Sequence, residues 1–183
     1  MAVDIQTFEE MKSFLCFTEE DAARLKTLQP IFEKYGPGIT DIFYDTLGRF
    51  PTTSKLIEGR VEHLKGTHRV WMGQLFSGDY GEDYFTHRVK IGLVHAKLGI
   101  EPRWVEGVMS VVRARSLEAL RAEISDVETV NAAFQSLLKI LDLDLLLINL
   151  AYSEEMFDRL TSATGMRRPL LINLIRRAAK ERG

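Results

Sequence analysis

The 183-residue sequence predicts an all-α protein, and three features of its pattern indicate this. Apolar residues recur at intervals of three and four positions through almost the whole chain, as they do along one face of a helix. No two alternating segments are joined by the two-residue turn of a β-hairpin. The prolines fall where we expect helices to begin or end, and they are Pro30, Pro37, Pro51, Pro102 and Pro169.

The same pattern places seven helices along the chain. We expect them over residues 5–14, 19–36, 37–50, 58–76, 84–98, 102–124 and 126–160. Thr18 is the predicted N-cap of the second helix, because three acidic residues follow it in a first turn where the helix dipole favours negative charge. Phe14 is expected on the apolar face of the first helix. Residues 51–53 are predicted to form a corner.

The last long helix contains a segment, residues 137–152, that is apolar on nearly all sides. A helix of this kind is buried on all sides. In a domain of this size one face can meet the core while another meets a partner. We therefore predict a homodimer built on the two long C-terminal helices, with a central core helix in a monomer as the alternative.

Charge is unevenly distributed along the chain. The net charge is −2, but six basic residues stand against Glu181 alone from Met166 onward, so this segment carries +5 and the remainder −7. An acidic body argues against nucleic acid as a partner. We expect a main domain over residues 1–160 and a basic linker or surface-binding tail over residues 161–183. The single cysteine, Cys16, and the lack of a signal peptide or membrane-spanning run predict a cytoplasmic protein.

The four histidines, His63, His68, His87 and His95, do not match the common metal motifs. None has a glutamate three residues before it, as di-iron carboxylate bundles require. No HExxH motif or Cys/His cluster indicates zinc. No G-x-S-x-G motif marks a nucleophile, although the sequence alone leaves a Ser/His/Asp triad without that motif open.

Two of the histidines suit a haem group. His68 shares an apolar stripe with Trp71, so we expect it to point inward, and His95 ends the next helix before Gly99. Two neutral imidazoles on successive helices with apolar walls fit a flat apolar cofactor whose iron takes axial ligands. Tyr44 would need a hydrogen-bond partner if buried, and a ligand on the iron is one candidate. The alternatives are core histidines and a tyrosine bonded to a backbone carbonyl.

From about Phe8 to Phe157 the chain resembles the globin domain of globin-coupled sensors. The resemblance is carried by Phe43-Tyr44, Leu64-Lys65, Trp71, Leu75-Phe76-Ser77-Gly78, Tyr84, Arg88, Ile91-Gly92-Leu93-Val94-His95 and Gly99-Ile100-Glu101-Pro102-Arg103-Trp104. It implies a globin fold with an extra N-terminal helix, a b-type haem and dimerisation through the two long C-terminal helices.

The resemblance also implies roles for individual residues. His95 would be the proximal iron ligand, and Tyr44 the distal tyrosine that hydrogen-bonds bound oxygen. Val105 stands where the family often has a tyrosine on the proximal side. We also expect Leu64 and Thr67, on the helix that carries His68, to contact the cofactor. His68 itself resembles the distal histidine that closes the sixth iron site in a minority of these sensors, which gives a bis-histidyl resting haem as our hypothesis.

We therefore predict a haem-based sensor of a diatomic gas (oxygen, also CO or NO) or of redox state, and not an enzyme. A helix shift would pass to a C-terminal domain, a membrane segment or a partner protein. The alternatives are a globin enzyme, such as a nitric-oxide dioxygenase or a peroxidase, and a haem-free helical interaction module.

Overall fold

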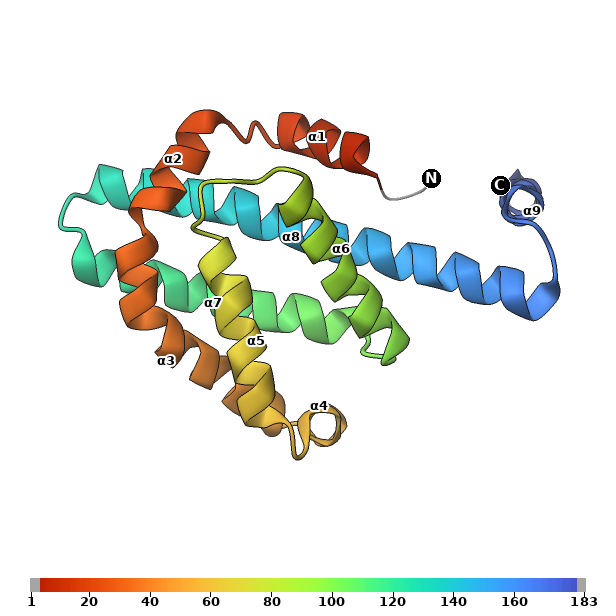
Figure 1. Cartoon of the computed structure of the whole chain (residues 1–183), viewed down its shortest axis with the longest axis horizontal. Coiled ribbons are helices and arrows are strands. Elements are labelled where there is room, and N and C mark those ends of the chain that lie inside the picture. Colours follow the sequence, from red (N-terminus) through yellow and green to blue (C-terminus); the bar gives the residue numbers. More distant parts are fainter. Residues whose placement is uncertain (1–3, 181–183) are drawn as a thin grey trace.

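The computed structural model describes residues 4–180, and these form nine α-helices and no strand (Figure 1). The helices are α1 (Ile5–Phe14), α2 (Glu19–Thr27), α3 (Gln29–Gly48), α4 (Pro51–Ile57), α5 (Val61–Gln74), α6 (Glu82–Lys97), α7 (Pro102–Glu123), α8 (Val127–Thr164) and α9 (Arg168–Lys180). The predicted all-α class is confirmed. The end of the predicted basic tail, residues 181–183, lies outside the described residues.

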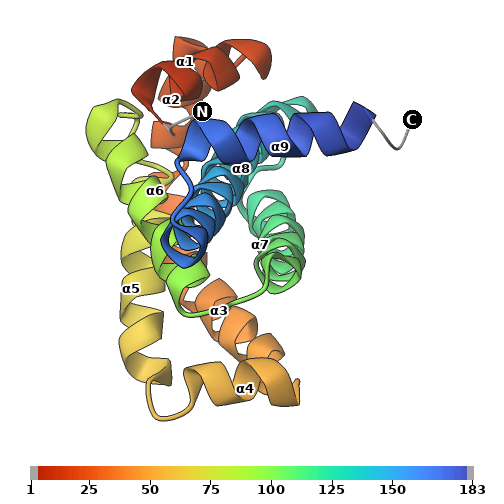
Figure 2. The ribbon, with the colours of Figure 1, turned by 90° about the vertical axis from the view of Figure 1, so that its right-hand side faces the viewer.

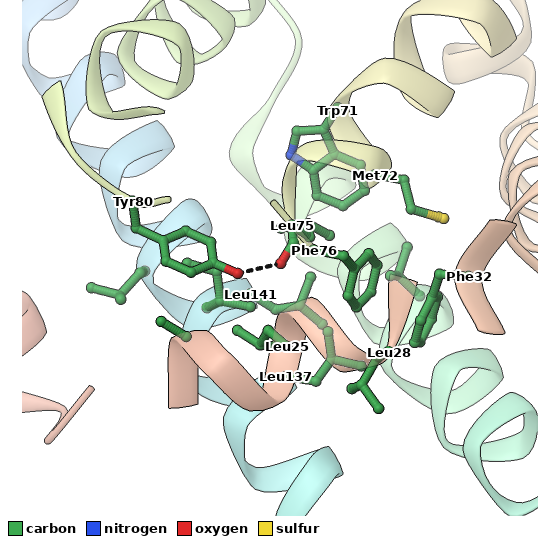
Figure 3. Close-up of a cluster of buried hydrophobic side chains, with 14 of the residues drawn as sticks. Leu25, Leu28, Phe32, Trp71, Met72, Leu75, Phe76, Tyr80, Leu137 and Leu141 are labelled. Carbon is green, nitrogen blue, oxygen red and sulfur yellow. Dashed lines mark hydrogen bonds between the residues drawn. The ribbon is translucent and has the colours of Figure 1, made fainter. Parts of the chain in front are cut away.

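Helix α8 runs along the molecule, and α1, α2, α6 and α7 pack against it (Figure 1). Its apolar residues are the centre of the core, since Leu137, Leu141 and Leu147 are almost completely inaccessible to solvent. Figure 3 shows where side chains from α2, α3 and α5 meet this surface. The rings of Phe32 and Phe76 stack there with centroids 4.0 Å apart.

The boundary between the second and third predicted helices was wrong. The break falls at Leu28, and Pro37 lies inside α3. Pro30 occupies the first turn of α3, where no intrahelical partner is required for its missing N–H. At Pro37 the helix lacks one hydrogen bond but continues, because Phe32 and Ile39 on either side are buried in the core.

Three further predictions concern the beginning of α2, the beginning of α4 and the apolar face of α1. Thr18 caps α2 in a reciprocal capping box with Asp21, as predicted. The predicted corner at residues 51–53 is the start of α4, because Pro51 begins a short helix and the buried Thr53 hydroxyl donates to a backbone carbonyl. Phe14 is exposed, so the apolar face of α1 ends before it.

The C-terminal part extends further than predicted. Helix α8 continues to Thr164, where Gly165 adopts a left-handed conformation with φ of 67° and ends it. The tail then forms α9, which lies crosswise to α8 near the C-terminal end of that helix (Figure 2). Arg168 holds α9 there by bonds to both carboxylate oxygens of Glu154. Within residues 4–180, none of the helices has the length and apolar character needed to cross a bilayer.

Helices α6 and α8 approach each other closely at Gly92. A Cβ atom on this glycine would lie 2.7 Å from the Ala151 Cβ and 2.9 Å from the Ile148 Cα. Only glycine therefore fits this contact. As a result, the backbone of α6 lies directly against α8 at a point one turn before His95.

This contact predicts a destabilised Gly92→Ala variant. The added methyl group must push the two helices apart, which we expect to lower the free energy of unfolding by roughly 1–3 kcal/mol. Gly38→Ala is the matched control, because Gly38 is exposed in α3 with no atom near its Cβ position. It should gain up to about 1 kcal/mol from helix propensity. Urea unfolding followed by circular dichroism measures both, and shifts in the same direction would contradict the prediction.

Candidate functional site

His95 is held in one orientation near the C-terminal end of α6. Its Nδ1 lies 2.8 Å from the backbone carbonyl oxygen of Ile91. A carbonyl can only accept, so Nδ1 carries the proton, and Nε2 of the neutral ring presents a lone pair. Burial lowers the pKa of His95 below its ordinary value, which keeps the ring neutral at pH 7. The side chain therefore has the form of a metal ligand.

The backbone around His95 is fixed by the end of its helix. Gly99 adopts a left-handed conformation with φ of 70°. The Ile100 N–H donates to the His95 carbonyl at 3.1 Å, and the Gly99 N–H donates to the Ala96 carbonyl at 3.1 Å. These two bonds form a Schellman motif, which satisfies carbonyls that the helix end would leave free. Arg159 of α8 also donates to the Ala96 carbonyl, so the end of α6 is fastened to α8.

His68 is buried on α5, with 8% of its surface exposed, as predicted from its apolar stripe. Its Nδ1 lies 2.9 Å from the hydroxyl oxygen of Thr40, a fully buried residue of α3. Its Nε2 is buried without a hydrogen-bond partner. Burial lowers the pKa of His68 to about 4, so the ring is neutral at pH 7. A buried nitrogen without a partner is costly unless something outside the described chain satisfies it.

Aromatic rings from α3 and from α5 itself surround His68. The ring centroids of Phe43, Trp71 and Tyr44 lie 4.4, 4.9 and 6.0 Å from that of His68. Tyr44 is buried, and burial raises its pKa to about 12, so its hydroxyl keeps its proton and can donate. The structure thus brings Tyr44 and His68 together. Thr40 joins them, although no sequence signal had selected it.

The other predicted cofactor residues occupy different environments. Leu64 is half-buried on α5, and Val105 is buried on α7. Thr67 is exposed, and its hydroxyl donates to the Leu64 carbonyl of its own helix at 2.8 Å. The structure does not bring Thr67 to His68, so its role stays a prediction, as do those of Leu64 and Val105.

Helices α5 and α6 pack against different helices of the domain. Helix α5 packs on α3, whereas α6 packs on α8, and the two diverge from the loop that joins them (Figure 1). Among residues 4–180 no three His, Cys, Asp or Glu side chains gather into a metal-binding cluster. A bare metal ion would find too few ligands here. A porphyrin supplies four equatorial nitrogens itself, so single imidazoles from α5 and α6 fit haem iron.

A buried ion pair, which the sequence reasoning missed, links these helices. The Arg88 Nε lies 3.0 and 2.9 Å from the two carboxylate oxygens of Asp144, and neither side chain is exposed. Tyr84 donates to the same carboxylate, and the Trp71 indole N–H donates to it at 2.7 Å. Arg88 also donates to Gln74 and to the Trp71 carbonyl. The sequence signals were an aspartate within a largely apolar run and the presence of Trp71, Tyr84 and Arg88 among the residues of the family resemblance, but neither showed that these side chains meet.

The sequence profile of the Protoglobin family matches residues 5–157, nearly the whole described chain. The chain belongs to the protoglobin family. This membership confirms the resemblance to sensor globins and the globin fold that the resemblance implied.

Two relatives extend the protoglobin comparison. The chain is 30% identical over 148 residues to the "Heme-based aerotactic transducer HemAT" of Halobacterium salinarum, a match that covers 72% of this chain and 29% of that relative. The globin domain of a Geobacter sulfurreducens globin-coupled sensor superposes with a TM-score of 0.75 at 32% identity, covering 79% of this chain and 96% of the other. The chain thus spans less than a third of HemAT but nearly all of the Geobacter domain.

The buried carboxylate predicts a large difference between two neighbouring aspartates of α8. Asp144→Ala leaves Arg88 charged and buried without its partner, so we expect a loss of about 3–5 kcal/mol in the free energy of unfolding. Asp142→Ala is the control, because Asp142 is half-exposed and pairs with Arg113 at the surface, where such pairs contribute about 0–1 kcal/mol. Chemical unfolding measures both losses, and equal losses would show that the buried pair has no special weight.

Proposed function

We propose that this chain is a haem-binding, gas-sensing globin domain in which His95 is the proximal ligand. The observation that carries this proposal is the fixed tautomer of His95, whose Nε2 lone pair is presented at the capped end of α6. Protoglobin membership and two relatives named as a haem-based transducer and a globin-coupled sensor support it. When bound, haem supplies an iron that coordinates a diatomic gas such as oxygen, CO or NO.

His68 is the second ligand in the resting state. Its buried Nε2 has no partner among the described residues, and coordination would remove the cost of leaving it unsatisfied. Its neighbour Tyr44 keeps its proton and can donate a hydrogen bond within the distal pocket. An incoming gas has to displace His68 from the iron, and a change in redox state would act on the same bond. Helix α5 therefore has two alternative positions, one with His68 bound and one with His68 displaced.

Competition at the distal position favours a sensor over an enzyme. A nitric-oxide dioxygenase or peroxidase needs rapid access for each turnover, whereas the imidazole of His68 would close the position that substrate must reach. A sensor needs two well-separated states, and displacement of His68 supplies them.

The proposed output runs through α8 and a homodimer. Leu146, Leu150, Met156 and Leu160 lie along one side of α8, where Leu150 packs partly against the core and Met156 and Leu160 are exposed. An apolar face of this length on the surface is typical of a protein interface. We propose that α7 and α8 pair with those of a second copy, and that the main domain continues into α9 as a basic linker toward a C-terminal output domain, a membrane segment or a partner. The exposed free thiol of Cys16 fits a reducing cytoplasm.

Titration of the purified protein with haemin tests the cofactor and its ligands. We expect a Soret band at 1:1 stoichiometry and a six-coordinate ferrous spectrum. His95→Ala should lose stoichiometric binding, whereas His68→Leu should keep the haem and become five-coordinate. His63→Ala is the matched control on α5, because His63 is exposed. A five-coordinate ferrous wild type would overturn the role of His68, and absence of a Soret band would overturn the whole proposal.

Sedimentation velocity tests the dimer. Two carboxylates placed by Met156→Glu and Leu160→Glu would have to be desolvated at the interface, so we expect this double variant to be monomeric. Val70→Glu changes an equally exposed apolar residue on α5 and should stay dimeric. A monomeric wild type would refute the interface.

A further inference from the structure

We propose that Trp71 is a positioning residue that couples the distal helix α5 to α8. Through its indole hydrogen bond to Asp144, a change in the position of His68 would act on α8, the helix on which the proposed output depends. This inference rests on the proposed function, because it describes how the displacement of His68 would affect the structure outside the distal pocket.

Trp71 lies close to His68. The two residues are three positions apart on α5, so they lie on neighbouring points of one helix face. Their ring centroids are 4.9 Å apart, and each side chain is 92% buried. A movement that takes His68 away from its resting position therefore also moves the Trp71 ring.

The indole N–H of Trp71 donates to a residue on a different helix. Its Nε1 lies 2.7 Å from Asp144 Oδ2 in the interior. Among the described residues this is the one side-chain hydrogen bond that joins α5 to α8. A bond to a buried carboxylate is short and directional, so a small rotation of the indole weakens it.

Asp144 is held in place independently of α5. Arg88 and Tyr84, both on α6, donate to its Oδ1, and the Arg88 Nε also lies 2.9 Å from its Oδ2. Helix α6 is in turn fastened to α8 at Gly92 and by the Arg159 bond to Ala96. The acceptor is thus fixed to the proximal half of the domain, whereas the donor belongs to α5.

The two ends of α5 are held by different helices. Arg88 donates to the Trp71 carbonyl at 3.2 Å and to Gln74 at 2.6 Å, so the last turn of α5 is tethered to α6. The part of α5 that carries His68 packs on α3 through the Thr40 bond and the Phe43 ring. Displacement of His68 is therefore a tilt about the Trp71 turn, which changes the angle of the indole toward Asp144.

Ultraviolet resonance Raman spectroscopy of the haem-loaded protein tests this directly. The chain has two tryptophans, so the Trp104→Phe variant assigns the indole bands to Trp71. We expect the hydrogen-bond-sensitive band of Trp71 to shift when CO binds to the ferrous wild type. In His68→Leu, where no histidine is displaced, the band should stay in place on CO binding. An unchanged band in the wild type would overturn the coupling.

A matched pair of variants provides the second test. Trp71→Phe and Tyr84→Phe each remove one donor to Asp144 and keep an aromatic ring, so a purely structural role would move both alike. We expect Trp71→Phe to raise the rate at which CO replaces His68 by about tenfold, the size of one lost charge-assisted bond. Tyr84→Phe should stay within about twofold of the wild type, because its bond does not involve α5. Equal changes would overturn the proposal.

The outcomes separate the coupling from the proposed function. Absence of haem binding by the wild type overturns both. Haem binding with displacement of His68 but no response of the Trp71 band overturns the coupling alone. If Trp71→Phe does not fold, the Raman comparison of wild type and His68→Leu still decides.

Discussion

The buried pair of Arg88 and Asp144 is the interaction on which the arrangement of the domain depends. Two opposite charges without solvent contact cost much desolvation energy, and their attraction repays it only with good geometry and further hydrogen bonds. Here Tyr84 and Trp71 complete the carboxylate, and Gln74 and a backbone carbonyl complete the guanidinium. Because these partners come from α5, α6 and α8, the pair fixes how three helices meet. Its main effect is therefore to determine one relative orientation of the two histidine-bearing helices.

The local sequence pattern correctly predicted those features that depend on the residues of a single helix. The stripe that contains His68 and Trp71 correctly placed both inside, and Gly99 correctly marked the end of the His95 helix. In each case the deciding physics acts over one or two turns. Thr18 as a cap belongs to the same class, because its bonds reach only to Asp21.

Contacts between distant segments could not be predicted in the same way. Arg88 and Asp144 are 56 residues apart, and Thr40 and His68 are 28 apart. Periodicity shows that each side chain faces inward but not which residue it meets there. Pro37 is the opposite case, where a strong local signal was overruled because α3 buries apolar residues on both sides of the proline. The helix continues through Pro37 because tertiary packing outweighs the low helix propensity of proline.

The partners of the two histidines have one last consequence. His95 is bonded to a carbonyl oxygen, which accepts only, so its outer nitrogen is permanently an electron-pair donor. His68 is bonded to a hydroxyl, which both accepts and donates. The Thr40 hydroxyl can accept from a protonated Nδ1 or, with its O–H rotated, donate to a bare Nδ1, so the bond is compatible with either tautomer of the distal ring. The second nitrogen of His68, which has no partner among the described residues, is thus free to carry either a lone pair or an N–H, whereas that of His95 can carry only a lone pair.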